Sequence, residues 1–273
     1  GGIQTTNAPL ALVRGLIKKG VRDLTLVPGV VSGVQSDMLI GAGCVKRLYC
    51  SSITLEFLGL APNFRRQAES GDLDVIECDE FFILKALRAG ATDLPFHPVP
   101  PGGHYGSDLP KVNPAYKTTI DPYSGNEVLV VPPLQPDVCF IHTSKSDPYG
   151  NAQHLGHLGA DDVMAEASSA VVVSCEEIVP LEETMANHLN VTIPSLMVNA
   201  VVYAPFGCHP GECHSNYTYD PAHLELYATV AQDVREMQRY LDTYVHEPQD
   251  HFAYLDLIGA RVLMDLALHR KEF

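Results

Sequence analysis

The sequence alternates short, nearly continuous apolar runs with stretches in which apolar residues recur at helical spacing. Residues 137–143 (DVCFIHT) and 170–179 (AVVVSCEEIV) are apolar almost throughout, as are strands buried on both faces of a parallel sheet. Residues 81–90 (FFILKALRAG) have the pattern of an amphipathic helix ending at a glycine, and they closely follow the strand-like run 74–78 (DVIEC). Strands and helices joined by such short links predict an α/β protein with a mostly parallel sheet.

Similar patterns predict further elements along the chain. Helices are expected at residues 9–19, 62–70 and 161–169, two C-terminal helices at about 221–246 and 249–268, and strands at residues 23–29 and 197–205. The segment 94–136 differs because it holds half of the 20 prolines, and we expect an irregular excursion that carries a hairpin. Since the alternation resumes directly after it, the sequence predicts a single domain over residues 1–273.

The charge balance argues against two classes of partner. The chain has 18 Lys and Arg residues against 33 Asp and Glu residues, a formal net charge of −15. Nucleic acids and anionic membranes are bound by basic surfaces, so we expect neither partner. No apolar run approaches the roughly 18 residues that span a bilayer, and no secretory leader is visible. Seven scattered cysteines, an odd number, favour a reducing, cytoplasmic setting over a disulfide framework.

No nucleotide, metal or hydrolase motif is complete. The sequence lacks the phosphate-binding loop GxxxxGK[ST], the dinucleotide loop GxGxxG between a strand and a helix, and the GxSxG nucleophile elbow. One short segment gathers side chains of zinc-ligand types, namely Cys208, His209, Glu212, Cys213 and His214. Because no second pair of ligands accompanies them, we predict no metal site but a tight turn, in which His209 packs inside the protein or lines an active site.

Two acids outside that segment admit both a structural and a functional interpretation. Glu80 directly follows the strand 74–78. With Asp79 as N-cap it fits the start of a helix, and it also lies where crevices form at the carboxyl ends of parallel strands. Glu56 lies among apolar residues and is either outward-facing or functional, because periodicity does not decide between the two.

Polar residues at the ends of the two buried strands are similarly ambiguous. His142 lies near the end of the first, where a hydrogen-bonded core histidine is the more common case than a catalytic base. Glu176 and Glu177 end the second, where a site and a helix entry fit equally well. Glycine-rich segments at residues 1–2, 29–33 and 102–103 lie at ends of predicted elements, where backbone N–H groups can approach a ligand closely.

Several motifs recur in the order typical of one known family. They are GGIQTTNAP (1–9), DLTLVPG (23–29), DMLIGAGCVKRLY (37–49), FRRQAESGDLDVIE (64–77), LPFHPV (94–99), PDVCFIH (136–142), DPYGNA (147–152), CEEIV (175–179) and AVVYAPFGCHP (200–210). In this order the chain resembles the A subunit of family I CoA-transferases, particularly the glutaconate CoA-transferase type, over essentially its whole length. The first motif departs from the family's GGF-x3-G-x-P element, with Ile3 for Phe and Asn7 for the third Gly.

The resemblance implies an open, doubly wound α/β fold and a homologous B subunit, in an A2B2 heterotetramer with active sites between the subunits. In the family the catalytic glutamate belongs to the B subunit, often within a Ser-Glu-Asn-Gly motif, and this chain contains no Glu-Asn-Gly. The implied reaction is ping-pong transfer of CoA between an acyl-CoA and a carboxylic acid through glutamyl intermediates. Coenzyme A thioester is then the substrate, and no other cofactor is expected.

The resemblance also implies particular positions in this chain. The implied substrate-binding residues are Gly1, Gly2, Gln4, Val31, Ser32, Glu56, Gly102, Gly103, Ser107 and His209. These loops would shape the acyl pocket and donate backbone N–H groups to the oxyanion. In the family an N-terminal helix and strand precede the Gly-Gly, so we expect them before Gly1 in the natural protein.

Glu80 supports an alternative function. Transferase A subunits of this family more often have Gln there, whereas the related steroid ring-cleaving CoA hydrolases have a glutamate in a similar Asp-Glu context. In this chain Asp79-Glu80 is followed by Leu-Pro-Phe at residues 94–96, at the same distance as in those hydrolases. A buried Glu80 would be a competent base for activating water, which would make the protein an acyl-CoA hydrolase. A third alternative is a non-catalytic assembly subunit.

Overall fold

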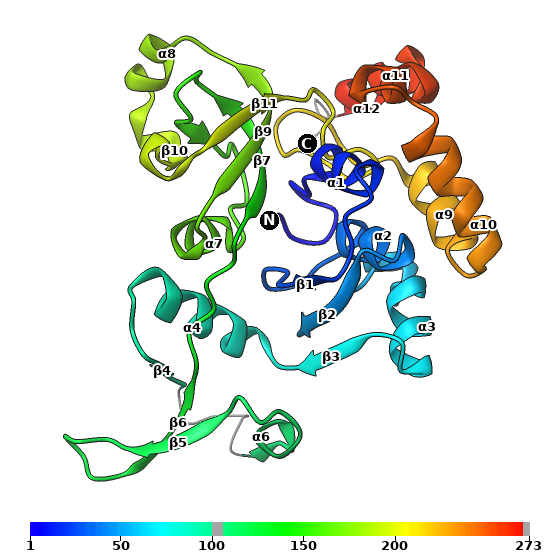
Figure 1. Cartoon of the computed structure of the whole chain (residues 1–273). Coiled ribbons are helices and arrows are strands. Elements are labelled where there is room, and N and C mark those ends of the chain that lie inside the picture. Colours follow the sequence, from blue (N-terminus) through cyan, green and yellow to red (C-terminus); the bar gives the residue numbers. More distant parts are fainter. Residues whose placement is uncertain (100–105, 270–273) are drawn as a thin grey trace.

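Three sheets carry the fold, and helices pack between and around them in the computed structural model (Figure 1). The structure describes residues 1–99 and 106–269, so two predicted binding residues, Gly102 and Gly103, lie outside the described residues. Helices and strands alternate through most of the chain, which confirms the α/β class. The parallel strand pairs are divided between two of the sheets.

The first sheet is parallel throughout, with the order β1-β2-β3. Its strands are Leu24–Leu26, Val45–Cys50 and Asp74–Glu77. Helix α2 (Val34–Gly41) connects β1 to β2, and α3 (Pro62–Ser70) connects β2 to β3, as parallel neighbours require. Helix α3 has the predicted bounds because Pro62 fits the first turn and Gly71, at φ 79°, ends it in the left-handed conformation.

The second sheet is mixed and has the order β10-β8-β7-β9-β11. Its parallel strands are β7 (Cys139–Ser146), β9 (Val171–Ile178) and β11 (Ala200–Tyr203), and its antiparallel edge is formed by β8 (Ala152–Gln153) and β10 (Val191–Ile193). Helix α7 (Asp161–Ala167) lies between β8 and β9 in sequence. The register places His142 of β7 opposite Ser174 of β9.

The proline-rich segment forms the third sheet and a short helix. Strand β4 (His97–Pro98) and the hairpin of β5 (Lys117–Ile120) and β6 (Glu127–Val131) are antiparallel, and α6 (Leu109–Val112) lies between β4 and β5 in sequence. The predicted hairpin is thereby confirmed. Shorter helices complete the connections: η1 (Glu56–Leu58), α8 (Leu181–Ala186), η2 (His188–Asn190) and η3 (Ser195–Met197).

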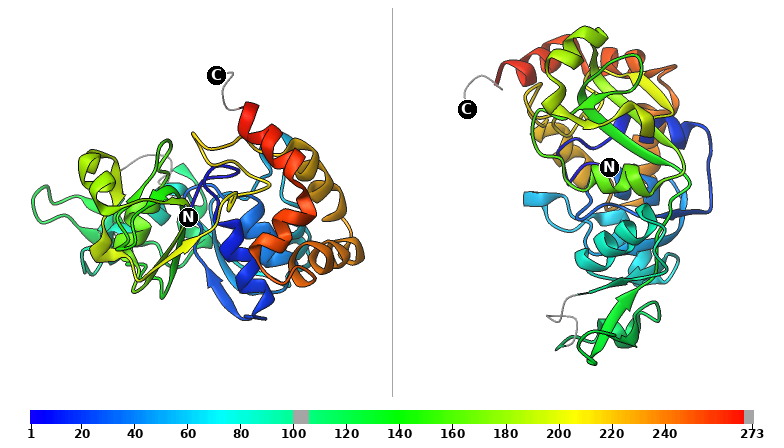
Figure 2. Two further views of the ribbon diagram at one scale, coloured as in Figure 1. Left: turned by 90° about the horizontal axis from the view of Figure 1, so that it is seen from above. Right: turned by 90° about the vertical axis from the view of Figure 1, so that its left-hand side faces the viewer.

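The two long C-terminal helices predicted from apolar spacing are wrong. Instead the chain forms α9 (Pro221–Val230), α10 (Val234–Leu241) continued by the π-helical turn η4 (Asp242–His246), α11 (His251–Ile258) and α12 (Ala260–His269) (Figure 2). The break between α9 and α10 follows local chemistry, because the Asp233 carboxylate accepts from the N–H groups of Arg235 and Glu236 at 2.8 and 3.1 Å and starts a new helix. Apolar spacing fixed the buried face but not the continuity of the helix.

Two hydrophobic clusters support this arrangement. One joins α1 (Leu10–Lys18), α2 and β2 to α9 and α10, and the other joins α4 (Glu80–Ala91) and α7 to β7 and β9. All seven cysteines are buried and unpaired, including Cys139 and Cys175 in the apolar strands. Among the described residues, no helix combines the length and apolarity that crossing a membrane requires.

Candidate functional site

The first seven residues form a tight loop ahead of α1. Ile3 and Thr6 exchange backbone N–H···O hydrogen bonds of 2.9 and 2.8 Å. Gly2, at φ 72°, donates its N–H to Oδ1 of Asp161 at 2.8 Å, at the start of α7. A Cβ at Gly2 would lie 2.6 Å from the carbonyl carbon of Asn7, so only glycine fits this turn.

This loop packs against the segments that follow β1 and β2. The backbone N–H of Gln4 donates to the carbonyl of Val31 at 3.2 Å, and its side-chain Nε2 donates to Thr54 Oγ1 at 3.0 Å. Gly33 permits the contact, because a Cβ there would lie 2.7 Å from the Gln4 carbonyl oxygen. Both strands belong to the same parallel sheet, so their carboxyl ends meet at one edge, where sites in open sheets form.

Glu56 completes this junction. Its Oε1 accepts from the backbone N–H of Thr5 at 3.3 Å and from Thr5 Oγ1 at 2.7 Å. Glu56 is half-buried and has φ 51°, a left-handed conformation that is uncommon outside glycine and typical of functional sites. Within residues 1–99 and 106–269, its second oxygen has no hydrogen-bond partner. That oxygen can accept a hydrogen bond from a ligand or a partner chain.

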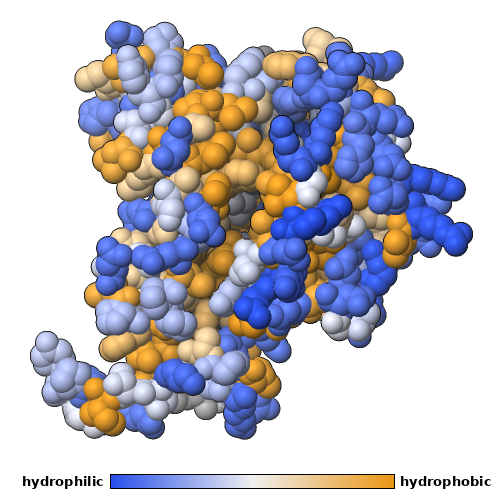
Figure 3. All heavy atoms as spheres, viewed as in Figure 1, coloured by the Kyte–Doolittle hydropathy of each residue, from blue (hydrophilic) through white to orange (hydrophobic). Residues whose placement is uncertain are grey.

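The structure therefore brings together six of the predicted binding residues. These are Gly1, Gly2, Gln4, Val31, Ser32 and Glu56. Ser32 contributes backbone only, since it is buried and its hydroxyl lies 2.6 Å from that of Ser36. Figure 3 shows the face of the molecule that is seen in Figure 1. Apolar side chains surround a hollow in the middle of this face, near the position that Figure 1 marks as the start of the chain.

Ser107 and Glu80 lie elsewhere. Ser107 is half-buried just before α6, where its Oγ accepts from the N–H of Leu109 at 3.4 Å. Helix α6 lies beside the small antiparallel sheet, away from the N-terminus in Figure 1. Asp79 caps α4 as predicted, accepting from the N–H of Phe82 at 2.8 Å, and Glu80 follows it as the first helical residue. Its side chain is exposed, so the burial that the hydrolase hypothesis assumed is wrong for this chain alone.

His209 does not line the site. It is fully buried, with Nδ1 2.7 Å from the hydroxyl of Tyr254 and Nε2 3.1 Å from Oδ2 of Asp220. Burial lowers the pKa of His209, and Arg14 lies close by, donating from Nη1 to the His209 carbonyl at 2.9 Å. The prediction that His209 binds substrate is therefore corrected. The His209 side chain instead packs in the core, where it contacts Tyr254 and Asp220.

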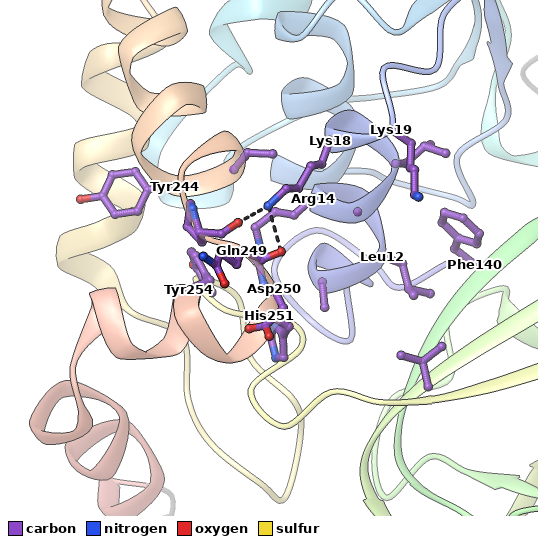
Figure 4. A pocket seen from close by; sticks show the side chains of 16 residues that line it. Leu12, Arg14, Lys18, Lys19, Phe140, Tyr244, Gln249, Asp250, His251 and Tyr254 are labelled. Atoms are coloured by element: carbon purple, nitrogen blue, oxygen red, sulfur yellow. Dashed lines mark hydrogen bonds between the residues drawn. The ribbon is translucent and has the colours of Figure 1, made fainter.

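A cavity of about 490 Å³ borders this core directly, because Arg14 and Tyr254 line it (Figure 4). It is lined by α1, by the segment between η4 and α11, and by Phe140 and Val202 of the second sheet. Lys18 crosses it and donates from Nζ to the carbonyl oxygens of Pro248 and, at 3.0 Å, Gln249. None of the predicted binding residues with a described position lines this cavity.

Glu176 lies in a buried network within β9 and not at a helix entry. Its Oε2 accepts from the N–H of Phe206 at 2.6 Å, and its Oε1 accepts from the N–H of Gly207, from Tyr217 Oη and from His142 Nε2 at 3.0, 2.9 and 2.7 Å. Burial would lower the pKa of His142, but hydrogen bonds with Cys213 and Glu176 outweigh it and raise that pKa to about 9. His142 is a core histidine, as the sequence favoured.

Two cysteines adjoin this network. Cys208 and Cys213 are both fully buried, and their Sγ atoms and a ring nitrogen of His142 all lie within 4.8 Å of one another. Hydrogen bonding from Cys208, together with His142, lowers the pKa of the Cys213 thiol against the effect of burial, whereas burial raises the pKa of Cys208. Local sequence patterns did not place His142 beside these cysteines, because His142 lies 66 residues before Cys208 in the chain.

Comparison with known proteins identifies relatives along the whole chain. The sequence model of a family described as coenzyme A transferase matches residues 1–204. The A subunit of glutaconate CoA-transferase from Acidaminococcus fermentans is 32% identical over 97% of this chain and 88% of its own length. The crystal structure of glutaconate coenzyme A-transferase from the same organism has a TM-score of 0.91 at 31% identity, covering 97% of this chain and 88% of that chain.

Two further relatives also match most of this chain. An uncharacterized protein of Archaeoglobus fulgidus is 34% identical over 95% of this chain, and this chain spans only 58% of that relative's length. A cholesterol ring-cleaving hydrolase IpdA subunit of Rhodococcus jostii is 30% identical over 92% of this chain and 87% of its own length.

Proposed function

The chain belongs to the coenzyme A transferase family as a family I A subunit, and from this premise we propose that, with a B subunit, it moves CoA between an acyl-CoA and a carboxylic acid. The observation that carries the proposal is the agreement of its fold with glutaconate coenzyme A-transferase, at a TM-score of 0.91 over 97% of this chain. Because relatives are named as one subunit of their enzymes, a B subunit is the expected partner.

In the proposed mechanism, the thioester carbonyl is attacked by a glutamate of the B subunit. CoA leaves as a thiolate and a mixed anhydride forms; the thiolate then attacks the glutamyl carbonyl and releases the first acid. The acceptor carboxylate repeats these steps in reverse on the enzyme–CoA thioester. This chain would shape the acyl pocket with the loop of residues 1–7 and with Glu56, which positions that loop through Thr5 and keeps its second oxygen for a ligand. The backbone N–H groups of residues 2–7 already donate within the chain, so the donors to the oxyanion of each tetrahedral intermediate would come from elsewhere in the complex.

Exposed apolar side chains beside the candidate site support a partner. Phe57 and Leu60, which follow Glu56, are 58% and 60% exposed. Large apolar groups in water beside a site are typical of surfaces that another chain covers. The net charge of −15 does not attract the polyanionic CoA, so we expect most of its binding groups in the B subunit. The buried, unpaired cysteines fit a reducing compartment, so we place the reaction in the cytoplasm.

Purification of this chain alone and together with its B subunit tests the proposal. We expect CoA exchange between acyl-CoA and free acids only from the two-chain complex. Exchange by this chain alone would contradict its assignment as an A subunit. Full exchange activity of the B subunit in the absence of this chain would instead favour a non-catalytic assembly role.

A second candidate function rests on Glu80. This chain has glutamate where transferase A subunits more often have Gln, and hydrolase subunits at 30% and 31% identity are among its relatives. In this alternative, a B subunit would cover the exposed Glu80, which would then act as a general base on water. Glu80→Gln in the complex separates the two functions: transfer should survive nearly unchanged, whereas hydrolysis should fall by about 100-fold or more.

Glu77→Gln provides the matched control, because Glu77 is also exposed and lies three residues away on β3. Both variants should fold alike. A loss of acyl-CoA hydrolysis in Glu80→Gln but not in Glu77→Gln would favour the hydrolase function.

A further inference from the structure

We propose that His142, Cys208 and Cys213 form a buried site for one divalent transition-metal ion of the zinc class, which fixes the turn that supports the candidate active-site loop. The sequence shows two of these ligands in a Cys-x4-Cys segment without a second pair. The fold supplies the third from β7, in the middle of the second sheet.

The geometry is close to that of a metal site. The two Sγ atoms and a ring nitrogen of His142 lie within 4.8 Å of one another. Zn–S and Zn–N bonds of about 2.3 and 2.0 Å place tetrahedral ligands roughly 3.4–3.8 Å apart. A contraction of at most about 1.0–1.4 Å would therefore complete the coordination. Ser144 Oγ, 3.7 Å from Cys213 Sγ, lies at such a separation, so it or a water molecule would occupy the fourth position.

The surroundings of His142 support the assignment. Metal-binding histidines use one ring nitrogen for the ion and hydrogen bond the other to a carboxylate or similar group. Here the two nitrogens face Glu176 Oε1 at 2.7 Å and Ser174 Oγ at 2.9 Å. Whichever nitrogen binds the ion, the other keeps its partner. The Ser174 hydroxyl can also turn to the carbonyl of Ile141, at 3.3 Å.

The ligand types select the class of ion. Two thiolates and one imidazole are soft donors that suit Zn²⁺ and discriminate against Mg²⁺ and Ca²⁺, which prefer oxygen. Both thiols are fully buried, where an ion held by protein ligands is protected from exchange with water. Since the ligands must be deprotonated, binding would release protons and tighten as the pH rises.

The site would act on the candidate active site through the turn between the two cysteines. Glu212, next to Cys213, donates its backbone N–H to Thr5 O at 2.8 Å and accepts from Asn7 N–H at 2.9 Å. Its Oε1 also accepts from Thr6 Oγ1 at 2.7 Å. A metal ion joining both ends of the turn to β7 would hold the loop of residues 1–7 in place. This consequence rests on the proposed function, whereas metal binding itself does not.

Metal analysis of the untagged protein tests the proposal. After growth with added zinc and dialysis, the wild-type protein should retain about one zinc ion per chain. Metal-free wild-type protein titrated with Co²⁺ should develop thiolate–cobalt charge-transfer absorption and the intense visible bands of a tetrahedral site. Absence of both the retained zinc and the cobalt bands would overturn the proposal, whatever the outcome of the activity assays.

Cys208→Ser and Cys213→Ser should each lower retained zinc at least tenfold, whereas Cys139→Ser, which changes a similarly buried cysteine on the same strand as His142, should not. Equal retention in all three variants would overturn the assignment. Should the variants fail to fold, a thiol count of denatured, unreduced, metal-free wild-type protein decides. Seven thiols support a free ligand pair, whereas five would mean that the pair is a disulfide instead of a metal site.

Discussion

Two polar regions meet at the turn of residues 208–213, and they are built in opposite ways. On one side, the loop of residues 1–7 rests on half-buried Glu56, which has one oxygen without a partner among the described residues. On the other side, the side chains of His142 and Glu176 are 0% and 6% exposed, and each of their ring nitrogens and carboxylate oxygens has a partner. Polar residues at strand ends therefore mark a site for an organic substrate only where hydrogen-bonding capacity remains, whereas the fully partnered His142 and Glu176 belong to the core and to the proposed metal site.

The largest effect is expected on the buried side, for Glu176→Gln. The amide has one acceptor oxygen, so its NH2 group would face a donor, either Phe206 N–H or the donors around Oε1. Breaking such a buried charged network costs about 3–5 kcal/mol of unfolding free energy. Urea unfolding of the wild-type chain and of Glu176→Gln measures this loss of unfolding free energy.

The neighbouring residue is the matched control. Glu177 follows in the sequence, but its side chain is 56% exposed and its nearest partner, Lys145, is 3.5 Å away. Glu177→Gln should change the unfolding free energy by no more than about 0.5 kcal/mol. Similar losses in both variants would show that the buried network has no special role in stability.

On the loop side, Gly33→Ala should cost about 1–3 kcal/mol, because its Cβ would meet the Gln4 carbonyl oxygen at 2.7 Å and the backbone must shift. Transfer activity of the two-chain complex should fall by more than about tenfold, since the displaced residue belongs to the candidate site.

Gly15→Ala is the control for this variant. Gly15 lies within α1, and beyond the adjacent backbone of that helix no described atom lies within 4 Å of a Cβ added to this residue, so alanine should stabilise the helix by about 0.5–1 kcal/mol. Unchanged transfer activity in Gly33→Ala would show that the loop of residues 1–7 is not part of the active site.

The sequence predicted the two regions unequally, for physical reasons. Local signals fixed α3 between Pro62 and Gly71. Gln4, Val31 and Glu56 lie close together in the structure, but only the family resemblance pointed to them, because no local pattern singles them out. The pairing of His142 with Glu176 was beyond local patterns, because it depends on the register of β7 against β9.

His209 shows a second limit of the sequence. A glycine-rich turn at a strand end has the same composition whether its side chains face solvent or the core. The structure turns His209 inward, against Tyr254 and Asp220, while Glu212 of the same turn contacts the loop. Only the packing of α11 and of the Asp220 N-cap region behind the turn decides between these outcomes, and both lie later in the chain.

Acid should lower the free energy of unfolding through His223, a buried histidine of α9 that lies beside His209 and Asp220. Burial, with His209 and Arg14 nearby, lowers the pKa of His223 to about 3, while Asp220 opposes the shift. Since the folded pKa lies below the unfolded value of about 6.5, the contribution is fully present above that value and is lost as pH falls toward 3. Between pH 7.5 and 5.5 the loss should be about 1.4 kcal/mol.

The measurement is urea unfolding at both pH values for the wild type and His223→Gln, which does not titrate. Tyr240, whose hydroxyl lies 2.8 Å from His223 Nε2, and Tyr244 also face this histidine, and neither changes charge in this range. An identical pH dependence in both proteins would assign the acid sensitivity to other groups.

The smallest effect on stability is expected for Glu80→Gln, because the side chain is exposed and its neighbour Asp79 already caps α4. The free energy of unfolding should change by no more than about 0.5 kcal/mol. A larger loss, measured by urea unfolding of the chain alone, would show that Glu80 has a structural role.

The division of labour between the two subunits is tested most directly by trapping the covalent intermediate. The two-chain complex is incubated with an acyl-CoA, treated with borohydride or hydroxylamine, and each chain is mapped by mass spectrometry. We expect one glutamate of the B subunit to be modified and no residue of this chain. A modified residue in this chain, or turnover without any modified glutamate, would contradict this division of labour.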